Sequence, residues 1–184
     1  METHDIVPAE SGDFGAVAAL FAQGFPESVE HVYGQDKPDF AAIAESYRFI
    51  WSLDRGLVHV ARRKGSGGGV DGYIAVLPSI RGFWRAVFSS GFASKMLVGW
   101  VRGKFRLPVR ALPLVIRNKL AFVRGARRMP EYDAQILSVA VSPAARGLGL
   151  GKALTAAGLA HLRAVGAHSV KLEVRPSNTP ARKT

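Results

Sequence analysis

Apolar positions recur at intervals of three and four residues in three parts of the chain, and this spacing predicts amphipathic helices. The first helix follows Asp13, which is placed to cap it, and the second begins near Pro38 and Asp39. The third runs over residues 149–165, with Gly166 at its C-cap. The supporting apolar positions are Phe14, Val17, Leu20 and Phe21; Phe40, Ile43, Tyr47 and Ile50; and Leu150, Leu154, Ala157 and Leu162.

Short apolar runs bounded by turn residues predict five strands, the first of them a short edge strand. They lie near residues 5–8, 57–61, 70–77, 134–141 and 168–174. The glycine-rich segment 65–69 predicts a hairpin, and residues 25–37 are predicted to be a loop. The almost wholly apolar run at 134–141 is typical of a strand covered on both faces. A strand, a helix and a strand joined this closely form a right-handed crossover, so we expect a mixed α/β fold.

Positive charge is concentrated in one segment of the chain. The 184 residues carry a formal net charge of +11, and residues 81–130 contain 12 Lys or Arg and no Asp or Glu. The rest of the chain has 13 basic and 14 acidic residues. The basic character therefore belongs to this segment and not to the whole chain.

The composition excludes several classes of protein and site. A content of 48% hydrophobic and 21% charged residues is typical of a globular protein of one domain. The absence of cysteine excludes disulfides and thiolate zinc sites, and the scattered histidines lack metal-ligand spacing, so no metal is expected. No Gly-x-Ser-x-Gly motif supports a serine hydrolase. A polar start and the lack of a run of about 20 apolar residues predict a cytoplasmic protein.

The segment from Arg146 to Lys152 has the composition of a phosphate-binding turn between a predicted strand and a predicted helix. Glycines let the backbone approach an anion, and the N–H groups of a first helical turn have no partner within the helix. The helix dipole adds positive charge there. A Walker A loop is excluded because Ala153 stands where Ser or Thr should bind magnesium. A dinucleotide fingerprint is excluded because its third glycine is missing from either possible start.

The turn does match the pattern Arg/Gln-x-x-Gly-x-Gly/Ala, with Arg146, Gly149 and Gly151 at the defined positions. Together with the strand before it, residues 136–152, the turn resembles the acetyl-CoA motif of the GNAT superfamily of N-acetyltransferases. Residues 172–178, Leu-Glu-Val-Arg-Pro-Ser-Asn, resemble that family's next strand and its asparagine. Residues 5–77 resemble the family only in outline. The resemblance implies a mixed, mostly antiparallel sheet flanked by helices.

The resemblance also implies how acetyl-CoA is held as co-substrate. Backbone groups of one strand would bind the pantetheine arm like an added strand, with a hydrogen bond from the asparagine, and the turn would surround the pyrophosphate. The implied cofactor-binding residues are Val139, Ala140, Val141, Arg146, Gly147, Leu148, Gly149, Leu150, Gly151, Lys152 and Asn178.

Direct acetyl transfer to an amine requires a group that accepts a proton. Similarity to the ribosomal-protein alanine acetyltransferases implies that Glu173 is this base. The acetyl carbonyl would then lie where the strand of Glu173 separates from the strand of Val139, with the developing oxyanion facing a backbone N–H. An ion pair with Arg175 on a solvated strand face is the alternative role for Glu173. Glu131 and Asp133 are weaker candidates, acting through water.

The family's general acid is commonly a tyrosine seven residues after the asparagine, which here would fall just after Thr184. We therefore expect residues 1–184 to form a single acyl-CoA N-acyltransferase domain that ends before the family's last helix and strand pair. The C-terminal strand pair would then be incomplete, or a second copy of the chain would complete the sheet as a homodimer.

Residues 81–130 stand where the family has a short connection, and their pattern predicts a basic helical insertion. Three interpretations stay open. The segment is a helical lid that packs its aromatics on the domain, a surface for anionic lipid or an acidic substrate, or a nucleic-acid-binding surface. The second would make the protein peripheral to a membrane. The apolar residues at helical spacing are Phe83, Trp84, Val87, Phe88, Met96, Leu97, Trp100 and Val101.

The sequence thus predicts an N-acetyltransferase that moves an acetyl group from acetyl-CoA to a primary amine of a small molecule or peptide. Two other functions stay open. One is a CoA-binding module without turnover, and the other is an adaptor that uses the basic insertion to bind a membrane or nucleic acid.

Overall fold

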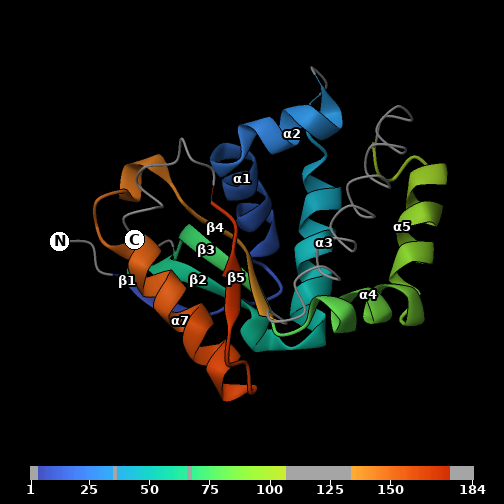
Figure 1. Cartoon of the computed structure of the whole chain (residues 1–184). Helices are drawn as coiled ribbons and strands as arrows, with labels where there is room; N and C mark the ends of the chain where they lie inside the picture. Colours follow the sequence, from blue (N-terminus) through green and yellow to red (C-terminus); the bar gives the residue numbers. More distant parts are fainter. Residues whose placement is uncertain (1–3, 35–36, 66–67, 107–133, 175–184) are drawn as a thin grey trace.

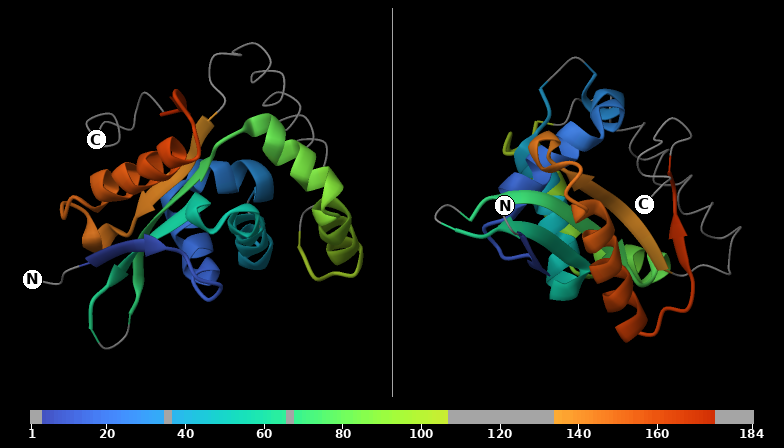
Figure 2. Two further views of the ribbon diagram at one scale, coloured as in Figure 1. Left: turned by 90° about the horizontal axis from the view of Figure 1, so that it is seen from below. Right: turned by 90° about the vertical axis from the view of Figure 1, so that its left-hand side faces the viewer.

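The computed structural model describes residues 4–34, 37–65, 68–106 and 134–174, and it shows one five-stranded sheet with helices on both faces (Figures 1 and 2). The strands are β1 (His4–Pro8), β2 (Val58–Arg63), β3 (Val70–Leu77), β4 (Ala134–Val141) and β5 (Val170–Leu172). The helices are α1 (Phe14–Gly24), α2 (Pro26–Tyr33), α3 (Phe40–Leu53), α4 (Ile80–Ser89), α5 (Phe92–Val101) and α7 (Leu150–Ala164), with short 3-10 turns η1 (Arg55–Leu57) and η2 (Pro143–Ala145). The predicted mixed α/β fold is confirmed.

The strands lie in chain order, β1 to β5. β1 to β4 pair antiparallel, and β1 is the predicted edge strand. β4 and β5 are parallel neighbours in the sheet, and the chain passes from one to the other through α7. This arrangement confirms the predicted crossover. β5 is shorter than the predicted strand at 168–174, because its pairing with β4 covers only three residues and ends at Ile136 and Leu172.

Helices cover β3 from both sides, and this buries the strand. On one face α7 lies so close that a Cβ at Gly158 would come within 2.8 Å of Ile74 Cδ1. On the other face the ring of Tyr47, from α3, packs edge-on against Tyr73 at 5.3 Å between centroids. The close approach of α7 depends on the missing side chain of Gly158, and it brings the N-terminus of α7 beside the end of β4.

The helix starts differ in part from the predictions. Asp39 caps α3 by accepting hydrogen bonds from the N–H groups of Ala41 and Ala42. Asp13 stands at the N-cap of α1, but its carboxylate accepts from Glu10 N and from Arg62 instead of from the helix.

The predicted loop at 25–37 was wrong, because residues 26–33 form α2. Pro26 occupies the first turn and Glu27 follows it there, which suits a helix N-terminus. α2 buries little apart from Tyr33, so its apolar periodicity is weak.

The first part of the basic insertion is helical, as predicted. We call residues 80–106 the α4–α5 arm, which extends from the sheet beyond α3 (Figure 1). Phe92 stacks on Phe49 of α3 with centroids 4.1 Å apart, and Lys95 pairs with Glu45 at 2.7 Å. Residues 107–130 lie outside the described ranges. No helix among the described residues is long and apolar enough to cross a membrane.

A histidine pair joins β2 to the end of α7. The rings of His59 and His161 lie 6.3 Å apart, and His161 Nε2 is 3.0 Å from Asp54 Oδ2. Burial, and next the charge of His161, hold the pKa of His59 below its usual value, although Asp54 opposes this. The ring of His161 thus packs against His59 and contacts Asp54, which lies 107 residues away in the sequence.

The lowered pKa of His59 predicts a loss of stability in mild acid. Unfolded His59 binds a proton more readily than folded His59, so the free energy of unfolding should fall as the pH drops below about 6.5. Urea unfolding between neutral pH and about pH 5 measures this effect. In His59→Gln the pH dependence should be shallower than in the wild type, and an unchanged slope would contradict the assignment.

Candidate active site

The turn between β4 and α7 offers a row of free backbone donors. Gly147 and Gly149 have φ of 81° and 75°, a region that residues with a side chain rarely adopt. Ala153 N donates to Gly149 O at 3.1 Å, which is the first bond of α7. Within the described chain, the six N–H groups of residues 147–152 have no hydrogen-bond acceptor. The turn is largely exposed, so this set of amides suits an anion such as a pyrophosphate.

Two positive side chains flank these amides. Arg146 and Lys152 are both exposed, and neither has an acidic partner among the residues that the structure describes. The start of α7 adds the positive end of its dipole at the same place. The charge of the site therefore complements a multiply charged phosphate group.

β4 and β5 pair over only three residues and then separate. Their paired residues end at Ile136 and Leu172, while β4 continues to Val141. At the same point the register between β3 and β4 shifts by one residue, so that Leu137 is left as a bulge. A bulge bends a strand and increases its twist. Beyond the bulge, the edge of β4 that faces away from β3 has no strand partner among the described residues.

The alternation of the strand decides which backbone groups point to this open edge. Ser142 N donates to Asp71 O at 2.7 Å, so the backbone of Ser142 is directed toward β3. Successive residues of a strand point their backbone groups to opposite sides. Val139 and Val141 therefore face the open edge, whereas Ala140 faces Tyr73 of β3, its partner in the register. Of the three strand residues predicted to bind the pantetheine arm, only Val139 and Val141 direct their backbone groups to the open edge.

A buried triangle of hydroxyl groups holds β4 where the strands separate. Tyr47 Oη lies 2.8 Å from Ser138 Oγ and 3.0 Å from Tyr73 Oη, and Tyr73 donates to Ser138 at 3.0 Å. Burial raises the pKa of Tyr47 to about 12 and that of Tyr73 well above its usual value. Both phenols are therefore neutral near pH 7, and their hydrogen bonds connect α3, β3 and β4.

Removing one hydroxyl from this triangle should destabilise the fold. Tyr73→Phe leaves two buried hydroxyls short of a partner, at a cost of about 1–3 kcal/mol in the free energy of unfolding. For a chain of this size, Tm should fall by about 2–4 °C per kcal/mol. The triple variant Tyr47→Phe, Tyr73→Phe and Ser138→Ala removes every member of the triangle, so it should lose less than the sum of the single variants. Additive losses in thermal unfolding would show that the three hydroxyls do not act together.

The predicted base, Glu173, follows directly after β5 on the strand that leaves β4. Its side chain is 63% exposed, and its carboxylate lies 2.5 Å from Lys171 Nζ. The ion pair is thus made with Lys171, two residues away on the same face of the strand. Arg175, the partner considered from the sequence, lies outside the described residues, as do Asn178, Glu131 and Asp133. Glu173 thus stands, exposed, just after the point where β5 separates from β4.

The tertiary structure brings together groups that the sequence did not connect. Tyr47 was expected only as an apolar helix position, and its hydroxyl contacts join residues 26 and 91 positions away. The bulge at Leu137 also had no sequence signal, since the whole run 134–141 is almost uniformly apolar.

Comparison with known proteins agrees with this geometry. Residues 88–184, more than half of the chain, match the family described as the Acetyltransferase (GNAT) family. The chain belongs to the GNAT acetyltransferase family. Proteins of this family are acetyltransferases that use acetyl-CoA.

Individual relatives of this GNAT protein extend the comparison. A segment of 64 residues, 35% of the chain, is 47% identical to a mycothiol acetyltransferase of Actinosynnema mirum. This segment spans only 22% of that protein's length. The structure of SsHAT superposes with a TM-score of 0.70 at 20% identity, over 98% of this chain and 87% of the other. That of yncA from Salmonella typhimurium with its cofactor acetyl-CoA superposes with a TM-score of 0.55 at 18% identity, over 98% and 75%. At these identities the two structures show a shared fold.

Proposed function

We propose that this GNAT protein transfers the acetyl group of acetyl-CoA directly to a primary amine of a small molecule or peptide. One observation supports the proposal: the open edge of β4 is followed, after the short turn η2, by the six free amides at the start of α7. Acetyl-CoA has the matching order of groups, because a flexible amide-containing arm joins its thioester to a pyrophosphate. In this proposal, residues 1–184 act as one acyltransferase domain that contains the basic insertion at 81–130.

The arm and the pyrophosphate would be held by different kinds of contact. Val139 and Val141 offer backbone donors and acceptors to the pantetheine amides, as a neighbouring strand would. The amides of residues 147–152 surround the pyrophosphate, while Arg146 and Lys152 balance its charge. Asn178, which lies outside the described residues, is proposed from the motif to bind the pantetheine arm.

The transfer itself needs a neutral amine, a stabilised oxyanion and a proton acceptor. The amine nitrogen attacks the acetyl carbonyl carbon, the new C–N bond forms, and the C–S bond breaks to release the CoA thiolate. Val139 N, at the open edge beside the bulge, is placed to stabilise the oxyanion. Glu173 accepts the proton that the amine loses, and Lys171 holds the carboxylate in position. The buried phenols of Tyr47 and Tyr73 stay neutral, so they do not act as the base.

Calorimetric titration of the chain tests this function. Acetyl-CoA should bind with higher affinity than acetyl-pantetheine, which lacks the pyrophosphate and so leaves the turn without its ligand. Thiol release with a panel of small-molecule and peptide amines then measures turnover. Equal affinity for the two thioesters, or no binding at millimolar acetyl-CoA, would contradict the proposed role of the turn. Binding without thiol release for any amine would favour a CoA-binding module.

A further inference from the structure

Apolar side chains on the α4–α5 arm are turned to solvent. Leu97, Val98 and Val101 are 55%, 45% and 72% exposed, and their spacing places them along one side of α5. Phe88, near the end of α4, is 73% exposed. Isolated apolar residues are common on protein surfaces, but a group of this size on one pair of short helices indicates a binding surface.

The charge around this apolar group has one sign. Every charged residue of the arm is basic, and they are Arg81, Arg85, Lys95, Arg102, Lys104 and Arg106. The acidic residues beside the arm already have partners. Glu45 pairs with Lys95 and Arg48, and the hydrogen bond from Lys95 is the main cause that holds the pKa of Glu45 below its usual value. Asp39 accepts a hydrogen bond from Arg106 N.

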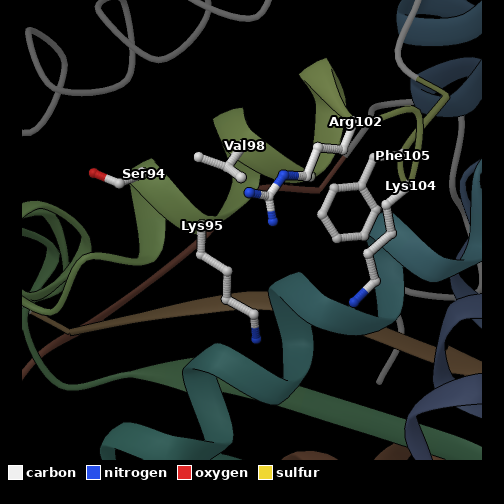
Figure 3. A pocket seen from close by; sticks show the side chains of 7 residues that line it. Ser94, Lys95, Val98, Arg102, Lys104 and Phe105 are labelled. Atoms are coloured by element: carbon white, nitrogen blue, oxygen red, sulfur yellow. The ribbon is translucent and has the colours of Figure 1, made fainter.

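A hollow of about 360 Å³ lies along α5 next to the exposed apolar side chains (Figure 3). Arg102 and Lys104 direct their charged groups toward it, and Val98 and Phe105 supply apolar walls. Neither Arg102 nor Lys104 has an acidic partner in the part of the chain that the structure describes. The hollow therefore presents two cations that lack an acidic partner among the described residues, beside Lys95, which pairs with Glu45, and this lining favours an anionic ligand.

The orientation of the aromatic residues separates a membrane from a nucleic acid as the partner. Single-stranded nucleic acids bind by stacking their bases on exposed aromatic rings. On the arm, Phe83 and Phe92 instead face inward and contact Phe49 of α3, with ring centroids 5.9 and 4.1 Å away. Phe105 is buried and packs against Gly99. Of the four most exposed apolar side chains of the arm, Leu97, Val98 and Val101 are aliphatic and only Phe88 is aromatic. This composition suits insertion between lipid chains better than stacking with bases.

We propose that the α4–α5 arm docks on the surface of an anionic phospholipid bilayer. Leu97, Val98, Val101 and Phe88 enter the boundary between headgroups and acyl chains, and the hollow between Arg102 and Lys104 holds a lipid phosphate. Basic side chains near an anionic surface each strengthen binding by a factor of about five, and salt weakens this contribution. The docking does not depend on acetyl transfer, so its test stands apart from that of the enzyme.

Co-sedimentation of the full chain with phospholipid vesicles tests the proposal. At about 0.1 M salt the chain should bind vesicles of phosphatidylcholine with a third phosphatidylglycerol, and bind pure phosphatidylcholine at least tenfold more weakly. Raising the salt to about 0.5 M should reduce the binding. The double variant Leu97→Ser and Arg102→Gln should lower the fraction bound at least tenfold.

A matched control uses the same chemical changes on the other side of the sheet. Leu159→Ser with Arg163→Gln alters an exposed leucine and an exposed arginine of α7, and should leave vesicle binding unchanged. Thermal unfolding of both variants confirms that each is folded. An equal loss of vesicle binding in both double variants would overturn the docking site. Equal binding of the wild type to charged and to uncharged vesicles would overturn it as well. Binding to single-stranded RNA that depends on Leu97 and Arg102, without vesicle binding, would overturn it in favour of nucleic acid.

Discussion

Replacing Glu173 with glutamine should lower kcat by about a hundred- to ten-thousand-fold and leave the Kd of acetyl-CoA unchanged. The carboxylate is exposed on the strand that leaves β4, so the substitution removes the proton acceptor without disturbing a packed core. Glutamine keeps the shape and length of glutamate. Thiol release at saturating amine measures kcat, and calorimetry measures the affinity for acetyl-CoA.

Lys171→Gln is the matched control for this prediction. It breaks the ion pair with Glu173 but leaves the carboxylate in place, so kcat should fall far less than in Glu173→Gln. Exposed ion pairs contribute less than about 1 kcal/mol, so neither variant should unfold. If Glu173→Gln retains wild-type kcat, Glu173 is not the base and serves only as the partner of Lys171.

Replacing Gly149 with alanine should raise the Kd of acetyl-CoA about tenfold, which corresponds to about 1.4 kcal/mol. Gly149 has φ of 75° at the N-cap of α7, and a residue with a Cβ pays about 1–2 kcal/mol to hold this conformation. No atom lies within 4 Å of the position of a new Cβ, so the protein around it does not oppose the change. The strain acts on the turn itself and displaces the amides that face the pyrophosphate.

Gly151→Ala supplies the comparison within the same turn. Gly151 does not have a positive φ, and a Cβ there also meets no atom within 4 Å. Alanine at this position fits the motif Arg/Gln-x-x-Gly-x-Gly/Ala, so the Kd should stay close to that of the wild type. Calorimetric titration of both variants with acetyl-CoA measures the two Kd values. Equal effects of the two substitutions would mean that side-chain bulk, and not the left-handed backbone of Gly149, controls binding.

The elements with the strongest periodicity were predictable from the sequence. β3 and β4 have the predicted bounds, 70–77 and 134–141, because each is a mostly apolar run with turn residues at its ends. α7 was also predictable, since its buried positions recur regularly and Gly166 ends it with φ of 90°. α2 was missed because it buries little beyond Tyr33, so that no apolar stripe marks it.

The parts of the candidate site also differ in whether the sequence predicted them. The glycine turn with its free amides was predictable because it is contained in one short segment of glycines, a strand end and a helix start. The hydroxyl triangle was not, because it joins three elements whose contacts span 26, 65 and 91 positions. Hydrophobic periodicity places Tyr47 on a buried helix face but does not say which residue its hydroxyl will meet.

The sequence by itself determined the family and the glycine turn between β4 and α7, because local backbone geometry follows from the order of glycines and helix-forming residues. Only the tertiary structure decided where β5 leaves β4 and which backbone groups face the gap between them. Both depend on the register between strands, and a bulge of one residue at Leu137 resets that register. The tertiary structure likewise decided that the arm turns Phe83 and Phe92 toward α3 and Leu97, Val98 and Val101 to solvent, because packing against Phe49 selects the inward face.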